Sequence, residues 1–227
     1  MGGRTLEEHA PRSTTVHVRI ALDVICVHSY LGYTRFIRAA DRLRAEGHQV
    51  RVEFLPFELA PGAGTEGQPL LPVLEQVFGA EAVRQTLRFA EQVAAEGLEL
   101  HYRRAVATGT FEAHLLIARA ARQGLAEPMV ERLFRAHFTD GLHIGDAATL
   151  ARLAEEIGVT EDDAGTAPAE ATAETGRLRA ELDRVRRLGV TGVPVFFIDG
   201  VRPLTGSQPE ATLFAALREA ARTASGF

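Results

Sequence analysis

The sequence predicts an α/β protein whose sheet is built from both ends of the chain, with a long helical segment between them. Three observations lead to this prediction. Strand and helix patterns alternate over 16–57, helical periodicity dominates 65–188, and strand and helix patterns return at 189–227. The expected element order is therefore β-α-β, a block of helices, and then β-β-α.

The first unit begins with a strand at 16–25 (VHVRIALDVI), which is rich in β-branched residues. A helix is predicted at 29–46, where apolar residues recur at near-helical spacing until Gly47 ends the pattern. A second strand is predicted at 50–57. Because a helix joins the two strands, they are expected to lie parallel in one sheet.

The central segment, 65–188, has an almost entirely helical pattern. Glycines and prolines divide it into separate candidate helices. The expected ranges are 69–77, 80–96, 110–123, 127–139, 146–157 and 169–188.

Strand character returns at 194–199 (PVFFID), and Asp199-Gly200 is a strong signal for a two-residue hairpin turn. The return strand is expected at 201–205, where Pro203 cannot donate to a ladder and therefore indicates an edge strand. A final helix is predicted at 208–222.

These elements suggest a division of the chain. The polar residues 1–15 are expected to form a disordered tail. Residues 16–64 and 189–227 together form the core, and 65–188 form an inserted helical subdomain.

Composition narrows the classes of function. The 227 residues carry a net charge of -5, which argues against a nucleic-acid partner and an anionic-membrane surface. No apolar run approaches the roughly 20 residues needed to cross a bilayer, and 1–15 lack the apolar region of a secretory signal. A single cysteine excludes an internal disulfide and fits a reducing compartment. We therefore expect a cytoplasmic protein.

That cysteine opens the motif Cys26-Val27-His28-Ser29, where the first strand gives way to the first helix. A thiol at a helix N-terminus meets unpaired N–H groups and the positive end of the helix dipole, and both stabilise the nucleophilic thiolate. His28 adds charge nearby, and Ser29 is placed to donate a hydrogen bond to the sulfur. A small buried apolar cysteine is the simpler alternative for Cys26 alone.

A second motif, Thr191-Gly192-Val193-Pro194, lies immediately before the third strand. An X-Pro bond is the one place where a cis peptide is inexpensive. A cis Pro194 would turn the backbone of Val193 towards the site, where it can pair with an extended substrate. The placement of the two motifs relative to the strands is more specific than either motif alone.

In these two motifs and their placement, the chain resembles the DsbA-like family of thioredoxin-fold proteins, specifically its FrnE-type branch, over about residues 17–222. The resemblance also rests on LFRAHFTDGLHIGD (133–146) and LTGSQPEATLFAAL (204–217). It implies a thioredoxin fold with a helical insertion in its middle. Glutathione transferase kappa and the 2-hydroxychromene-2-carboxylate isomerases are related groups, and pairing into a homodimer is common in the family.

The chain departs from the family at its active site. The family usually shows Cys-Pro-Trp-Cys, whereas Ser29 stands here in place of the second cysteine. A cycle through an active-site disulfide is therefore in doubt. The resemblance also implies that His114 lines the active-site pocket. A buried, hydrogen-bonded core histidine is an equally weighted alternative for this residue.

Three functions follow as hypotheses. The first is monothiol exchange, in which Cys26 attacks a mixed disulfide or a protein or peptide disulfide, and a low-molecular-weight thiol resolves the adduct. The second is a thiol-dependent isomerase or transferase acting on a small molecule of secondary metabolism, such as a polyketide. The third is a redox-inactive binding protein of the same fold. We expect no metal and no tightly bound cofactor.

Overall fold

The computed structural model of the chain describes residues 13–160 and 168–225. In this part of the chain the main sheet has four strands in the order β2-β1-β5-β6. β1 and β2 are parallel, and β5 is antiparallel to both β1 and β6. The strands are β1 (Thr15–Leu22), β2 (Gln49–Pro56), β5 (Val195–Ile198) and β6 (Leu204–Thr205). The predicted α/β class is thereby confirmed.

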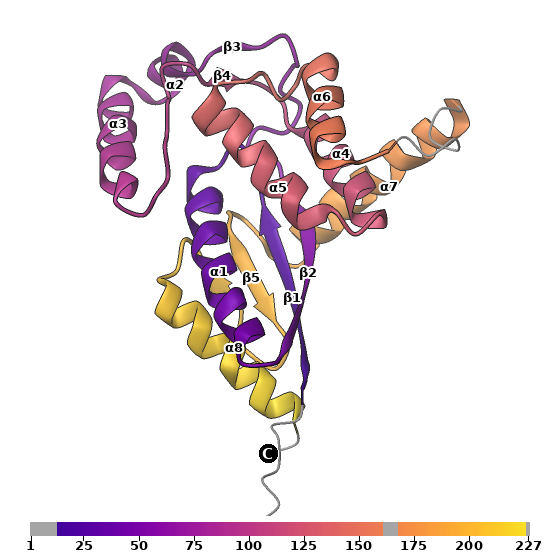
Figure 1. Cartoon of the computed structure of the whole chain (residues 1–227). Coiled ribbons are helices and arrows are strands. Elements are labelled where there is room, and N and C mark those ends of the chain that lie inside the picture. Colours follow the sequence, from indigo (N-terminus) through magenta and orange to yellow (C-terminus); the bar gives the residue numbers. More distant parts are fainter. Residues whose placement is uncertain (1–12, 161–167, 226–227) are drawn as a thin grey trace, which may run out of the picture.

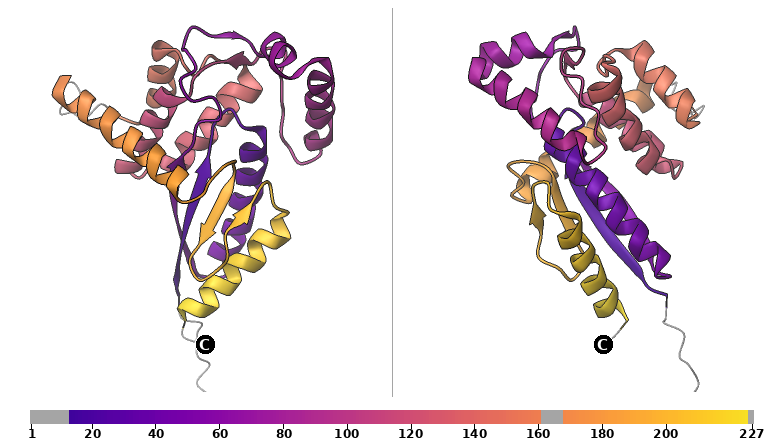
Figure 2. Two further views of the ribbon diagram at one scale, coloured as in Figure 1. Left: turned by 180° about the vertical axis from the view of Figure 1, so that it is seen from behind. Right: turned by 60° about the vertical axis from the view of Figure 1, so that its left-hand side comes forward.

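Helices α1 (Val27–Ala45) and α8 (Glu210–Ala224) lie side by side over one face of this sheet (Figures 1 and 2). Their apolar faces form the main core: Phe36 stacks on Phe196 with ring centroids 5.8 Å apart, and Leu217 is fully buried. The opposite face carries a smaller cluster, in which Val185 near the end of α7 (Pro168–Arg187) packs with Ala21 and Leu55.

The helical block sits beyond the ends of β1 and β2, next to the start of α1 (Figure 1). A short ribbon of β3 and β4 pairs within it. Its elements are β3 (Gln68–Pro69), α2 (Leu70–Phe78), α3 (Ala80–Ala94), β4 (Val106–Ala107), α4 (Phe111–Arg122), α5 (Ala126–Arg135), a π-helical turn η1 (Ala136–Asp140) and α6 (Ala147–Ile157). The helical insertion expected from the sequence is thus present.

Several predicted boundaries were wrong. β1 ends at Leu22 rather than 25, because the N–H of Cys26 bonds to the carbonyl of Asp23 and turns the chain into α1. Asp199-Gly200 does not form a two-residue hairpin: β5 and β6 pair Val195 with Thr205, so the connection is longer and Pro203 lies in it. The β3–β4 ribbon and the π-helical turn were not foreseen, since two-residue strands carry no periodicity.

The predicted disordered tail is mostly outside the described residues, and its last member, Thr15, begins β1. The division into a core and an inserted subdomain stays a prediction. Among the residues that the structure describes, no helix combines the length and apolarity that a membrane span requires.

A candidate active site around Cys26

Cys26 caps the N-terminus of α1 with an extended backbone (φ -90°, ψ 111°). The tight turn after β1 delivers it there, and its carbonyl accepts the first helical hydrogen bond from the N–H of Tyr30 at 3.0 Å. The thiol therefore lies among the unpaired N–H groups that open a helix. The side chain is buried, with 7% of its surface exposed.

The Val193-Pro194 bond is cis and lies directly against the sulfur. The thiol of Cys26 donates a hydrogen bond to the carbonyl oxygen of Val193 at 3.6 Å. The Pro194 carbonyl in turn accepts from the N–H of Gly206 at 2.8 Å, which ties this loop to β6. Gly32 makes room for the loop, because a Cβ there would lie only 2.9 Å from Cγ of Pro194.

Burial decides the ionisation of the resting thiol. It raises the pKa of Cys26 above the ordinary value, and the negative charge of Asp23 adds to the rise. The hydroxyl of Ser29 and the backbone N–H groups of Ser29 and His28 act in the opposite direction and hold the pKa lower than burial alone would. The helix N-terminus therefore stabilises the thiolate as expected, but desolvation outweighs it.

Ser29 and His28 occupy different surroundings. Ser29 is fully buried one turn into α1, and its hydroxyl oxygen has no hydrogen-bond partner among the described residues in the resting thiol form. It is nonetheless close enough to lower the pKa of Cys26. The His28 side chain is exposed and packs on Phe89 of α3, with ring centroids 5.0 Å apart.

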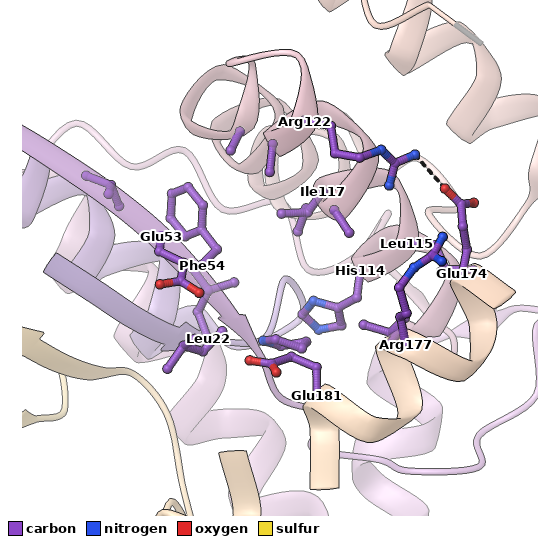
Figure 3. Close-up of a pocket in the computed structure, with 17 residues that line it drawn as sticks. Leu22, Glu53, Phe54, His114, Leu115, Ile117, Arg122, Glu174, Arg177 and Glu181 are labelled. Atoms are coloured by element: carbon purple, nitrogen blue, oxygen red, sulfur yellow. Dashed lines mark hydrogen bonds and ion pairs between the residues drawn. The ribbon is translucent and has the colours of Figure 1, made fainter. Parts of the chain in front are cut away.

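Beneath the turn that carries Cys26 lies a buried pair, Asp23 and His114. One carboxylate oxygen of Asp23 accepts from the N–H of Leu59 at 2.8 Å, and the other lies 3.6 Å from Nε2 of His114. His114 is also 3.0 Å from the carbonyl oxygen of Phe57. Its ring stands at the floor of a groove between β2, α4 and α7 (Figure 3). The histidine is thus both buried in the core and part of a groove wall.

Two further groups near the site were not assigned a role from the sequence. Burial raises the pKa of Tyr102, and the negative charge of a Cys26 thiolate adds to this rise. The π-helical turn buries His137, and neither ring nitrogen has a hydrogen-bond partner among the described residues. Burial lowers the pKa of His137 to about 4.

The structure therefore brings together Cys26, Ser29, Val193 and Pro194. The side chain of Thr191 is exposed on the loop that leads to Val193. Asp23 could have been suspected from the sequence, because it is an acidic residue at the end of an apolar strand. His137 carried no such signal, since π-helical turns have no periodic pattern. Within the described ranges, no group of three or more metal-binding side chains is assembled.

The model of the DSBA-like thioredoxin domain matches residues 17–218. The chain belongs to this family. A curated relative, the uncharacterized protein YwbO of Bacillus subtilis, is 26% identical over 188 residues, which cover 81% of this chain and 87% of the relative.

Solved structures agree with this assignment. A probable DsbA oxidoreductase from Streptomyces coelicolor superposes with a TM-score of 0.78 at 29% identity, covering 90% of this chain and 89% of that one. The cytosolic disulfide reductase DsbM of Pseudomonas aeruginosa gives 0.59 at 25% identity, covering 92% and 100%, and it has also been solved with GSH. A 2-hydroxychromene-2-carboxylate isomerase shares the fold, with a TM-score of 0.64 at 17% identity over 91% and 97% of the two chains.

Proposed function

We propose that the chain is a thiol–disulfide exchange enzyme in which Cys26 is the only sulfur nucleophile and an external low-molecular-weight thiol completes the cycle. The observation that carries this proposal is the contact of the Cys26 thiol with the Val193 carbonyl beside a cis proline, in a chain with no second cysteine. A mixed disulfide on Cys26 has no internal thiol to resolve it. The second sulfur must come from solution.

The exchange balances in two steps. The Cys26 thiolate attacks a disulfide formed between a substrate thiol and a small thiol; a Cys26–small-thiol disulfide forms, and the substrate leaves as a thiolate that takes up a proton. A second small-thiol anion then attacks that mixed disulfide, releasing the oxidised small thiol and restoring the Cys26 thiolate. In net, one free small thiol is consumed, the substrate leaves as a thiol, and the small thiol that was bound to the substrate leaves in the oxidised small-thiol disulfide.

The raised pKa of Cys26 slows this chemistry but does not prevent it. Each unit of increase lowers the thiolate fraction about tenfold at neutral pH, whereas the remaining thiolate becomes about threefold more nucleophilic, so the net loss is about threefold per unit. The hydroxyl of Ser29 and the N–H groups of the first turn limit the rise. In the family, the nucleophilic cysteine lies at the N-terminus of a helix. Cys26 keeps this position at the start of α1.

Substrate docking is assigned to the loop before β5. The Val193 carbonyl is bound by the thiol in the resting protein. An extended substrate whose N–H pairs with that carbonyl would take the thiol's acceptor away and leave the sulfur facing the substrate. The side chains of Thr191 and His28 are both exposed to solvent.

Support for a small thiol as co-substrate comes from the relative DsbM, which is described as a cytosolic disulfide reductase and has been solved with GSH. As part of the proposal, we extend to this chain both the use of a small thiol and a location in the reducing cytoplasm. Glutathione is the natural probe, and other small thiols of the same reactivity satisfy the same chemistry.

The proposal is tested by incubating the full chain with oxidised glutathione and measuring its intact mass. Wild type is expected to gain one glutathione at Cys26 and to lose it again on addition of reduced glutathione. Cys26→Ala provides the blank. If the folded chain gains no adduct while the urea-unfolded chain does, the exchange function is wrong.

One observation favours a second candidate, a thiol-dependent isomerase acting on a small molecule. A neutral Cys26 thiol beside the unpartnered Ser29 hydroxyl offers two donors to the thiolate of an external thiol. In that case Cys26→Ser would keep activity, because serine keeps the donor, and no mixed disulfide would form. The remaining alternative, a redox-inactive binding protein, predicts that Cys26→Ala leaves cellular function unchanged.

A further inference from the structure

A groove of about 610 Å³ lies between the edge strand β2 and the helices α4 and α7 (Figure 3). The sheet order places it across β1 from β5, on the side of the sheet away from the loop of Val193 and Pro194. Its volume falls within the range of about 300–1,000 Å³ that is usual for small-ligand sites. Its lining is mainly apolar and includes Ile117, Ala118, Ala121 and Leu178.

The backbone of β2 forms one wall of this groove, and its orientation follows from two hydrogen bonds. The N–H of Gln49 bonds to the carbonyl of Thr14 at 2.8 Å, and that of Phe57 bonds to the carbonyl of Leu22 at 3.1 Å. Both donors therefore face β1. Because backbone groups alternate sides along a parallel strand, the even-numbered residues of β2 direct their N–H and C=O groups outward.

The outward groups are free at two positions that line the groove. Across the described part of the chain, the N–H and C=O groups of Val52 and Phe54 have no hydrogen-bond partner on that side. The outward carbonyl of Val50 is bonded by the guanidinium of Arg44 at 3.4 Å, and Pro56 has no N–H to offer. The open edge is thus confined to the stretch inside the groove.

Most charged side chains around the groove are paired with one another. Arg122 pairs with the buried Glu174 at 2.5 Å, Glu181 pairs with Arg184 at 2.5 Å, and Arg177 lies 3.9 Å from Glu170, while Glu53 is the remaining charged side chain of the lining. The wall opposite β2 is formed by α4, which presents the exposed, small side chains of Ala118 and Ala121. Small residues there keep space open beside the strand.

We propose that this groove binds an extended segment of a partner polypeptide, which adds to the sheet as a short strand beside β2. An extended backbone supplies N–H and C=O groups in the alternation that Val52 and Phe54 leave unsatisfied. Its side chains on one face meet the apolar wall of α4 and α7. A free apolar small molecule would fill the volume but leave the four backbone groups unpaired, so the groove favours a peptide.

The experiment uses the full chain and a pool of capped hexapeptides randomised over Ala, Val, Thr and Ser. Amide chemical shifts of the isotope-labelled protein are followed as the pool is added. Shifts are expected at 52–54 and along α4, and a pool N-methylated at every residue should produce none, because it cannot donate to β2. Shifts centred on Cys26 and Val193 instead would contradict the assignment.

Two variants and a matched control sharpen the test. Ala118→Leu fills the groove and Val52→Pro removes one outward N–H without touching the β1–β2 ladder; each should weaken binding at least tenfold. Ala148→Leu adds the same side chain at an exposed position of α6 and should bind like wild type. Any of three results would overturn the proposal: wild type does not bind the pool below about 1 mM, the N-methylated pool binds equally well, or Ala118→Leu binds as wild type does.

Discussion

The thiol of Cys26 donates to the carbonyl oxygen of Val193 over 3.6 Å, across 167 residues of sequence. This contact joins the start of α1 to the cis-proline loop and keeps the sulfur buried. The same burial that positions the nucleophile also keeps it protonated. The reactivity of the site therefore depends on what replaces the Val193 carbonyl as the partner of the thiol.

The pH dependence of alkylation should reveal this burial. Because the pKa of Cys26 is raised in the folded chain, its reaction with iodoacetamide should increase with pH beyond about 8.5, the value for a free thiol. The unfolded chain supplies the reference curve. Because the pKa of Cys26 is higher in the folded chain than in the unfolded chain, the protonated thiol contributes fully to stability below the unfolded-state pKa. This contribution is lost as pH rises through the folded-state pKa. A folded-state midpoint at a lower pH than the midpoint of the unfolded chain would contradict the burial argument.

Ser29→Cys should restore a two-cysteine site. The buried serine position has room for a sulfur of similar shape, and its hydroxyl has no partner to lose in the described structure. After oxidation the folded variant should show no free thiol with a thiol reagent, and after reduction it should show two. Ser29→Ala is the control and should keep one free thiol while raising the pKa of Cys26 further, since one of the groups that lower it is removed.

Gly32→Ala should destabilise the chain. Its Cβ would lie 2.9 Å from the ring of Pro194 and 3.3 Å from Phe196, so α1 or the loop must shift. Overpacking of this kind costs about 1–3 kcal/mol. Gly176→Ala in α7 is the matched control, because nothing lies within 4 Å of its Cβ; it should stabilise the helix by about 0.5–1 kcal/mol. Urea unfolding of both variants measures the difference, and equal midpoints would refute the close approach.

His137 should make the chain sensitive to acid. Its pKa is lowered to about 4 by burial, whereas the unfolded value is about 6.5. The unfolded state therefore takes up a proton first, so stability is full above the unfolded pKa and declines as pH falls towards 4. Between about pH 7 and pH 5 the loss is on the order of 2 kcal/mol.

His137→Leu removes this titration. Its unfolding free energy should fall less than that of wild type between those two pH values, whatever its absolute stability. Parallel curves for the two proteins would show that His137 is not responsible.

The sequence was informative wherever a pattern is local and periodic. The strand–helix junction at Cys26 and the placement of Val193 and Pro194 followed from strand, helix and proline signals, and the structure brings these residues together. The rest depends on packing. At Cys26, burial raises the pKa more than the helix terminus lowers it. This balance, the place of Asp23 beneath the turn and the burial of His137 all depend on segments that are far apart in the chain. No local sequence pattern records such contacts. The hairpin prediction failed because a strong dipeptide signal fixes a turn but not the length of the connection around it.

If Cys26 cycles alone through a mixed disulfide, its kinetics must show that intermediate. In steady-state reduction of the mixed disulfide of glutathione and 2-mercaptoethanol, with reduced glutathione as the second substrate, we expect ping-pong kinetics with parallel double-reciprocal lines, and loss of activity in Cys26→Ala. Intersecting lines, or activity that survives in Cys26→Ala, would contradict it.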